Sequence, residues 1–339
     1  MDWSIAAATG KRLVRPGPVI PREQAEQTVH ALHAVNGTAE QHVRELTGLG
    51  HGLPLHDAEV VDRPGWVQAA TDGLATLTSR AVPRRDRGPL NSVLASSAGV
   101  QTGVLLAFLG SRVLGQYDPF GPKGSGGRLL LVAPNVVSAQ QALGVSAKDF
   151  RMWVCLHECT HRLQFNAVPW LREYFAGEVS RLLSGLTDED NSKLNRLPEL
   201  IKQAREARKG DGALAVAELL TSPEQRVVLD RLIALSTLLE GHADHVMDAV
   251  GPSVVPSVAT IRRRFTERRR GGGVLDRVLR VLLGVDAKVK QYAQGSAFTR
   301  HVVDTVGMDG FNVAWESPET LPTRAEITDP DAWLRRVRP

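Results

Sequence analysis

The chain has 339 residues, of which 42% are hydrophobic and 23% are charged, and its formal net charge at pH 7 is +4. This composition excludes an intrinsically disordered chain and provides enough apolar side chains for a sizeable core, in one large domain or two closely associated domains. The charge is small for this length, so the composition as a whole does not indicate a nucleic-acid-binding protein.

Hydrophobic periodicity close to 3.6 residues predicts a mainly α-helical protein. In the first half of the chain the predicted helices cover residues 22–46, 64–79, 90–114, 148–165 and 170–183. In the second half they cover residues 190–208, 212–220, 223–250, 255–270, 275–283 and 287–306. Polar residues interrupt the apolar segment 90–114, so we expect a buried helix there rather than a membrane span.

Strand signals are few. Residues 128–133 give the clearest one, with a candidate partner strand at residues 311–315. Residues 48–62 and 119–127 are typical of long loops. We therefore expect only a small β element in a mainly helical fold.

We expect three parts along the chain. Residues 1–120 would form an N-terminal helical region packed on a catalytic region at residues 121–316, and residues 317–339 would form a tail rich in proline and charge. No N-terminal stretch combines a basic region, an apolar segment and a cleavage site. Together with the cysteines, this favours a cytoplasmic protein.

Cys155 and Cys159 lie four residues apart on one predicted helix. Helical geometry disfavours a disulfide between them, so we expect both to pack as small apolar groups in a reducing compartment.

A run of arginines lies at residues 262–264 and 268–270, followed by three glycines at residues 271–273. Such a run could contact phosphates, but Phe265 is its one aromatic residue. The pattern favours a solvated helix face or a patch for an acidic partner, and we expect no nucleic-acid partner.

Residues 157–161 read His-Glu-Cys-Thr-His, an H-E-x-x-H pattern. On a helix, His157 and His161 share one face and can bind one zinc ion, while Glu158 can reach a water on that ion. The flanking residues favour a buried helix, with Ser146 and Asp149 as candidate caps and an end within residues 166–169. The pattern therefore predicts the core of a zinc metallopeptidase.

A catalytic zinc site needs a third protein ligand. A metzincin would have Gly and His three and six residues after His161, but Gln164 and Ala167 stand there. Glu240 and Asp244 are one helical turn apart, so the first could bind zinc and the second could accept the N–H of a zinc-bound histidine.

His242 and His245 lie in the same segment and are the rival third ligands. At about 100° per residue, His242 is turned about 200° from Glu240 and His245 about 140°, so neither shares the face of Glu240.

The H-E-x-x-H pattern followed by Glu240 and Asp244 resembles the gluzincins, such as thermolysin-like peptidases, in which a second helix supplies E-x-x-x-D. The resemblance implies that Glu240 is the third ligand and that Asp244 orients His157. The separation of Glu240 from His161 is longer here than in thermolysin-like enzymes, so extra helices must fill it.

Three further blocks, at residues 115–120, 129–135 and 153–156, are similar to a zincin-like family. Its members are labelled zinc-dependent metalloproteases or proteins associated with the biosynthesis of a deazaflavin coenzyme. The resemblance implies a Zn²⁺ cofactor and a peptide or protein substrate.

We expect a zincin-like hydrolase that cleaves peptide bonds, with Glu158 as the general base for a zinc-activated water. The strand at residues 128–133 could pair with an extended substrate. Two alternatives stay open: a degenerate zincin whose metal site serves binding, and an amidohydrolase acting on a non-peptide amide in coenzyme metabolism. The candidate oxyanion stabilisers are Tyr292, His301, His245 and Arg162.

Overall fold

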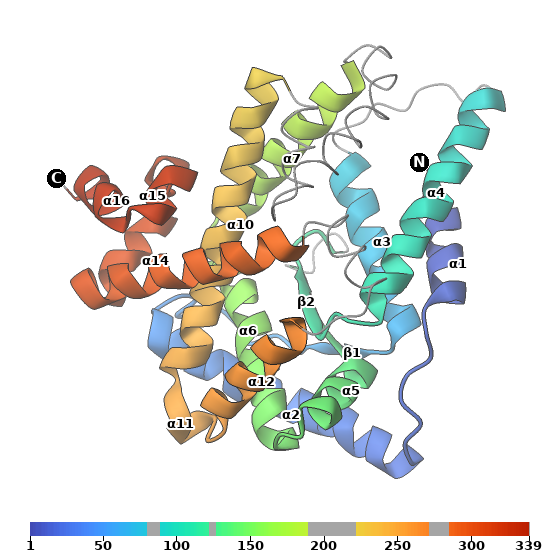
Figure 1. The fold of residues 1–339 in the computed structure, drawn as a ribbon, viewed down its shortest axis with the longest axis horizontal. Helices are drawn as coiled ribbons and strands as arrows, with labels where there is room; N and C mark the ends of the chain where they lie inside the picture. Colours follow the sequence, from blue (N-terminus) through green and yellow to red (C-terminus); the bar gives the residue numbers. More distant parts are fainter. Residues whose placement is uncertain (80–88, 122–126, 189–221, 271–284, 339) are drawn as a thin grey trace. The chain divides into compact units, whose positions relative to one another are not determined.

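The computed structural model describes residues 1–79, 89–121, 127–188, 222–270 and 285–338. It contains two compact units, and we describe each by itself. Unit 1 comprises Met1–Arg172 and Val246–Arg264, and unit 2 comprises Glu173–His245 and Phe265–Pro339. The fold is mainly α-helical with one small sheet, as predicted (Figure 1). The expected three-part division of the chain stays a prediction.

Unit 1 contains a three-stranded sheet. Its strands are β1 (Glu59–Val61), β2 (Gly115–Asp118) and β3 (Arg128–Val132), in the order β1-β3-β2. β3, the predicted strand, is central: it pairs parallel with β1 and antiparallel with β2. The loop predicted at residues 48–62 therefore ends in a strand.

The partner strand predicted at residues 311–315 is wrong. Phe311 ends a helix and Asn312–Trp315 is a 3-10 helix of unit 2. Phe311 and Trp315 are four residues apart and both contact the ring of His242, a spacing that a helical turn satisfies and a strand does not.

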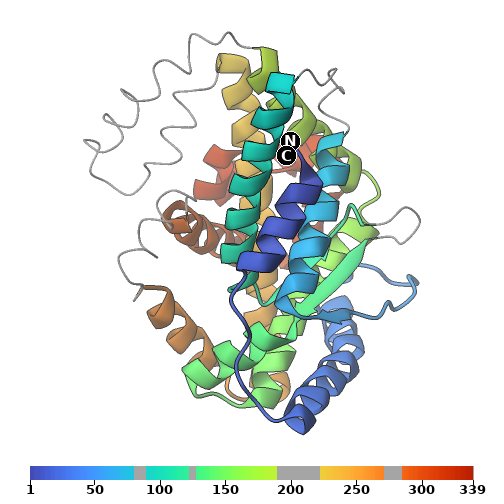
Figure 2. The same cartoon turned by 90° about the vertical axis from the view of Figure 1, so that its right-hand side faces the viewer.

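The N-terminal helices of unit 1 are α1 (Trp3–Leu13), α2 (Arg22–Thr47), α3 (Arg63–Ser79) and α4 (Pro89–Gly110). α1 was not predicted from the sequence; Asp2 caps it by accepting hydrogen bonds from the backbone N–H groups of Ser4 and Ile5. Figure 2 shows α1 beside α3 and α4. Gly103 permits this close packing, because a Cβ there would lie 2.6 Å from the Thr9 side chain.

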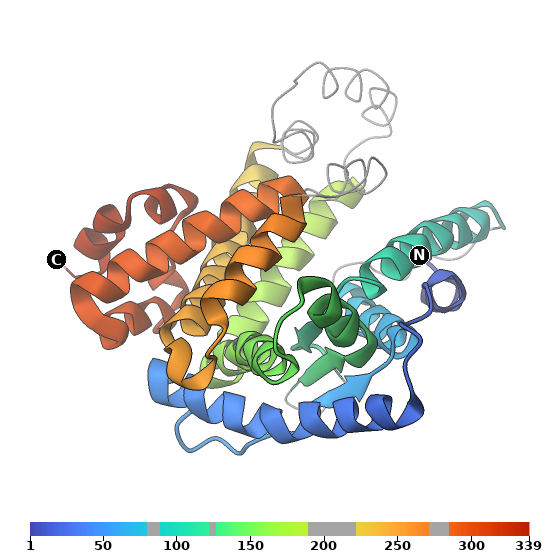
Figure 3. The same cartoon turned by 60° about the horizontal axis from the view of Figure 1, so that its bottom comes forward.

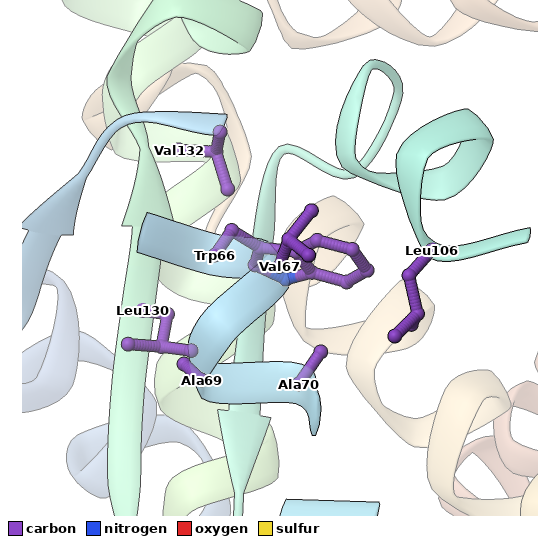
Figure 4. Packing of buried hydrophobic residues seen from close by; sticks show 7 residues of the cluster. All are labelled: Trp66, Val67, Ala69, Ala70, Leu106, Leu130 and Val132. Atoms are coloured by element: carbon purple, nitrogen blue, oxygen red, sulfur yellow. The ribbon is translucent and has the colours of Figure 1, made fainter. Parts of the chain in front are cut away.

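A buried apolar cluster holds α3 and α4 against the sheet. It consists of Trp66, Val67, Ala69, Ala70, Leu106, Leu130 and Val132 (Figure 4). Burying such side chains contributes roughly 1.5–3 kcal/mol each for the larger ones. The cluster fixes the sheet, and with it the position of β2.

The remaining helices of unit 1 are α5 (Ala133–Leu143), α6 (Ala147–Ala167), α11 (Gly251–Val254) and α12 (Val258–Arg270), the last extending into unit 2. α6 carries the H-E-x-x-H pattern and ends within the predicted segment. Ser146 caps it as predicted, accepting the N–H of Asp149. α2 packs across α6 (Figure 3).

Unit 2 is built from helices: α7 (Leu171–Asp188), α10 (Pro223–Ala249), α14 (Val285–Phe311), η2 (Asn312–Trp315), η3 (Pro318–Thr320), α15 (Arg324–Thr328) and α16 (Pro330–Val337). The first two residues of α7 and the last four of α10 belong to unit 1. The tail expected at residues 317–339 is thus largely helical, and its Trp333 is fully buried against Phe298 of α14.

The helices predicted at residues 190–208, 212–220 and 275–283, and the glycines at residues 271–273, lie outside the described residues. No described helix combines the length and the apolar character needed to cross a membrane.

Candidate metal centre

His157 and His161 lie one turn apart on α6, and both are partly exposed. Their Nε2 atoms are 3.2 Å apart and their rings are nearly perpendicular, at 86°. Two nitrogen ligands at about 2.0–2.1 Å from one tetrahedral zinc ion would be about 3.3 Å apart. The two imidazoles therefore fit a shared zinc ion.

Gln164 holds Nδ1 of His161, the ring nitrogen that faces away from His157. From the sequence, Gln164 was noted only because a metzincin would have glycine at that position. Nδ1 of His161 lies 2.8 Å from Oε1 of Gln164, whose side chain is fully buried. An amide oxygen can only accept, so this contact favours a proton on Nδ1, which would leave the lone pair of Nε2 facing His157. The i, i+3 spacing was the available signal.

The outer nitrogen of His157 lies 3.2 Å from Sδ of Met247. Met247 stands near the end of α10, in the part that belongs to unit 1. The sequence gives no sign of this contact, because 90 positions separate the two residues and methionine is an uncommon partner of histidine. A thioether is a weak acceptor, so it holds the ring mainly by packing.

Glu158 is buried, with 6% of its surface exposed, and it packs against β2. A Cβ on Gly115 would lie 2.6 Å from Cγ and 2.7 Å from Cδ of Glu158. The absence of a side chain at Gly115 therefore makes room for the Glu158 carboxyl group. Gly115 was noticed in the sequence only as part of a family block.

Successive residues of strand β2 point alternately towards α6 and towards α3. Gly115 and Tyr117 face α6, where Tyr117 donates to Oδ1 of Asn166 at 2.8 Å. Asp118 faces α3, where a Cβ on Gly73 would lie 2.7 Å from Oδ2. Burial raises the pKa of both Tyr117 and Asp118. β2 is thus anchored on both faces beside Glu158.

Strand β3 does not have the role expected for it. Both of its edges are paired, with β1 and with β2, so it has no free edge for an extended peptide. Within the described sheet, β1 and β2 are the edge strands, and β2 is the one that contacts α6.

Glu240, His242 and Asp244 lie on α10, in the part that belongs to unit 2. Glu240 and Asp244 are partly exposed, whereas His242 is fully buried. The ring of His242 lies 4.9 Å from Phe311 and 5.7 Å from Trp315. His242 therefore faces the aromatic core of unit 2, and the face that carries Glu240 is turned away from that core.

Arg162, an expected candidate for oxyanion stabilisation, instead lies in a buried ion network. Its Nη1 atom is 2.5 Å from Oε2 of Glu40, and Arg44 bonds the other oxygen of the same carboxylate. Arg162 also donates to the carbonyl oxygen of His56. These contacts tie α2 and the following loop to α6, so Arg162 has a structural role.

The other oxyanion candidates, His245, Tyr292 and His301, belong to unit 2. Nε2 of His301 lies 2.8 Å from Oδ1 of Asp331 at the surface of unit 2. The side chain of Tyr292 lies outside the described residues, and His245 lies on α10.

Cys155 and Cys159 are both free and fully buried on α6, as expected for packing residues. Burial raises the pKa of Cys155 to about 12 and that of Cys159 well above its usual value. Both therefore remain thiols near neutral pH and are poor metal ligands.

Two arginines of the basic run have structural partners in unit 1. Arg262 pairs with Asp248 at 2.8 Å, and Arg264 donates to the carbonyl oxygens of Leu143 and Gly144 at the end of α5. These contacts account for two of the arginines, and the expectation of no nucleic-acid partner stays a prediction.

A helix that presents two histidines four residues apart, with a buried glutamate between them, defines the zincin class of metal-dependent hydrolases. The comparisons with known proteins agree. The profile of the zincin-like metallopeptidase family matches residues 1–334, and the chain belongs to this family.

A solved structure from Chloroflexus aurantiacus, provisionally described as a hydrolase with a novel fold, is 33% identical to this chain. The similarity covers 99% of this chain and 98% of that chain, with a TM-score of 0.67. None of the curated proteins compared with the chain matches it.

Proposed function

We propose that this protein is a zinc-dependent peptidase in which His157 and His161 bind the metal and Glu158 is the general base. The observation that carries the proposal is the arrangement on α6: two Nε2 atoms 3.2 Å apart and, between the histidines, a buried glutamate for which Gly115 makes room. A purely structural metal site would have no use for a buried base beside the metal.

We further propose Glu240 as the third ligand. With His157 and His161 it would complete a set of two histidines and one glutamate, which catalytic zinc sites use. Seven residues, or about two turns, separate Glu240 from Met247 on the continuous helix α10, so the two share one face. Met247 contacts His157, which supports the assignment.

The burial of His242 among aromatic rings supports Glu240 over the rival ligand. A ligand must turn a donor atom towards the metal, and the face of Glu240 is about 160° from that of His242. We propose that Asp244, one turn from Glu240 on the same face, accepts the Nδ1–H of His157. A carboxylate is a much stronger acceptor than the Met247 sulfur.

When bound, zinc acts as a Lewis acid and makes water a nucleophile near neutral pH. The chain's own residues then move the proton and hold the reactants. Glu158 accepts a proton from the attacking water, and the same carboxyl group returns it to the leaving amine. Burial beside β2 keeps this carboxyl group in one position between the two steps.

We propose that β2, rather than β3, offers the edge on which an extended substrate lies. β2 contacts the same helix that carries Glu158, and its residue Gly115 lies against that carboxyl group. Pairing along this edge would use backbone hydrogen bonds and would bring a peptide bond beside the proposed base. The proposed partner is thus a peptide or protein chain.

We also propose a reducing compartment such as the cytoplasm for this protein, because its own cysteines, Cys155 and Cys159, are free and buried.

The test uses the zinc-loaded protein and its Glu158→Gln variant against a diverse peptide library. The variant should keep its zinc, because no ligand changes, but hydrolysis should fall by at least about 100-fold, as for the loss of a general base. If the zinc-loaded wild type cleaves no peptide but hydrolyses small amides, the substrate is a non-peptide amide. If neither reaction occurs, the site is that of a degenerate zincin.

A further inference from the structure

We propose that Gln164 is a positioning residue that fixes His161 in the tautomer whose Nε2 lone pair faces the metal. This inference rests on the proposed function, because it concerns the same site, but it makes a claim about the metal-free protein that can be measured by itself.

The contact is short and shielded from solvent. Oε1 of Gln164 lies 2.8 Å from Nδ1 of His161, and the Gln164 side chain has no exposed surface. Both residues are on α6, three positions apart, so the helix backbone sets their separation. Water therefore has little access to compete for the Nδ1 proton.

The chemistry follows from the count of protons. A neutral imidazole carries one N–H, so an acceptor at Nδ1 leaves the lone pair on Nε2. Nε2 of His161 points at Nε2 of His157, 3.2 Å away, where a metal shared by both rings would be held. The Gln164 contact thus selects the tautomer of His161 that can bind metal, and it restricts rotation of the His161 imidazole ring.

The acceptor is neutral, and this distinguishes Gln164 from the carboxylate often found behind a zinc-bound histidine. The amide fixes the orientation without adding a charge. A glutamate at position 164 would offer an equivalent oxygen, whereas a leucine would fill a similar volume and accept no hydrogen bond. These two substitutions separate the hydrogen bond from the packing of the side chain.

The experiment uses nitrogen-15 NMR of histidine-labelled, metal-free protein at a pH where His161 is neutral, with its signal assigned through a His161→Gln variant. Wild type should show His161 with its proton on Nδ1. Gln164→Leu should lose this preference, and Gln164→Glu should retain it. A wild-type signal with the proton on Nε2 would overturn the inference, even if the leucine variant failed to fold.

Zinc affinity, measured by competition with a chelator, provides the second readout. Gln164→Leu should weaken zinc binding about 10- to 100-fold, as changes behind a metal ligand do, and Gln164→Glu should restore it. Thr160→Val is the matched control, because Thr160 is equally buried on α6 and its hydroxyl donates to the carbonyl oxygen of Leu156 in the same helix.

The control should leave both the tautomer and the affinity unchanged. Equal affinity of wild type and Gln164→Leu would overturn the inference. If instead the wild type binds no zinc, the proposed function fails, while the tautomer measurement still decides the role of Gln164.

Discussion

Replacing Gly115 with alanine tests how the proposed base is held. The new Cβ would lie 2.6 Å from Cγ, 2.7 Å from Cδ and 2.8 Å from Oε1 of Glu158. Carbon atoms in ordinary contact are about 3.5–4.0 Å apart, so the overlap is about 1 Å. Gly115 is not among the glycines with positive φ, so alanine adds no backbone strain and the effect is steric.

The overlap must be relieved by moving the Glu158 carboxyl group, the strand or both. A displacement of about 1 Å at a catalytic group can lower the rate about 100-fold. Overpacking of this kind also lowers the free energy of unfolding by about 1–3 kcal/mol. Zinc affinity should stay near that of wild type, because the three atoms nearest the new methyl group all belong to Glu158, which is not a proposed ligand.

The assay measures peptide hydrolysis, zinc affinity and urea unfolding for Gly115→Ala beside a Gly37→Ala control. Gly37 lies on α2 and has no atom within 4 Å of the position of an added Cβ. The control should keep full activity and gain up to about 1 kcal/mol of stability from helix propensity. Unchanged turnover of Gly115→Ala, with zinc bound, would refute the reasoning that Gly115 makes room for a working base.

Three further predictions concern stability and the ligand set. Glu40→Ala should lower the free energy of unfolding by about 3–5 kcal/mol, because it leaves the buried guanidinium of Arg162 without its carboxylate. The control Glu59→Ala, which breaks the more exposed pair with Arg128, should cost less than about 1 kcal/mol. Urea unfolding measures both. Burial raises the pKa of Asp118 in the folded state, so the folded state binds the proton at higher pH than the unfolded chain does. Wild type should therefore gain stability relative to Asp118→Asn as the pH falls through the raised pKa towards about 3.9, and a flat difference between their unfolding curves over this range would contradict the assignment. Glu240→Ala should largely lose zinc in a chelator competition while His242→Ala should keep it, and the opposite order would replace the glutamate with a histidine ligand.

Local signals in the sequence were sufficient to predict α6 and its metal-binding face. The H-E-x-x-H spacing, the Ser146 cap and the end of the helix before Pro169 all depend on residues close together in the chain, and the structure confirms the cap and the bounds. Helix α10 was likewise predictable from its long run of helically spaced apolar residues, and its observed range is within one residue of the expected one.

Long-range contacts explain what the sequence could not provide. The packing of Gly115 on Glu158 and of Met247 on His157 joins residues far apart in the chain, and neither glycine nor methionine signals such a role. Helix α1 was not predicted, although its buried residues Ala6, Ala7 and Gly10 follow the helical period. The central position of β3 likewise depends on its pairing with β1 and β2, and both of these strands are too short to give a clear signal in the sequence.

The central claim is that α6 presents two histidines to a zinc ion in a hydrolase site, and metal analysis combined with X-ray absorption tests it most directly. The account predicts about one zinc per chain, bound by nitrogen and oxygen at about 2.0–2.2 Å with no sulfur ligand, and loss of that zinc in His157→Ala and His161→Ala. A sulfur ligand, or zinc that both histidine variants retain, would contradict it.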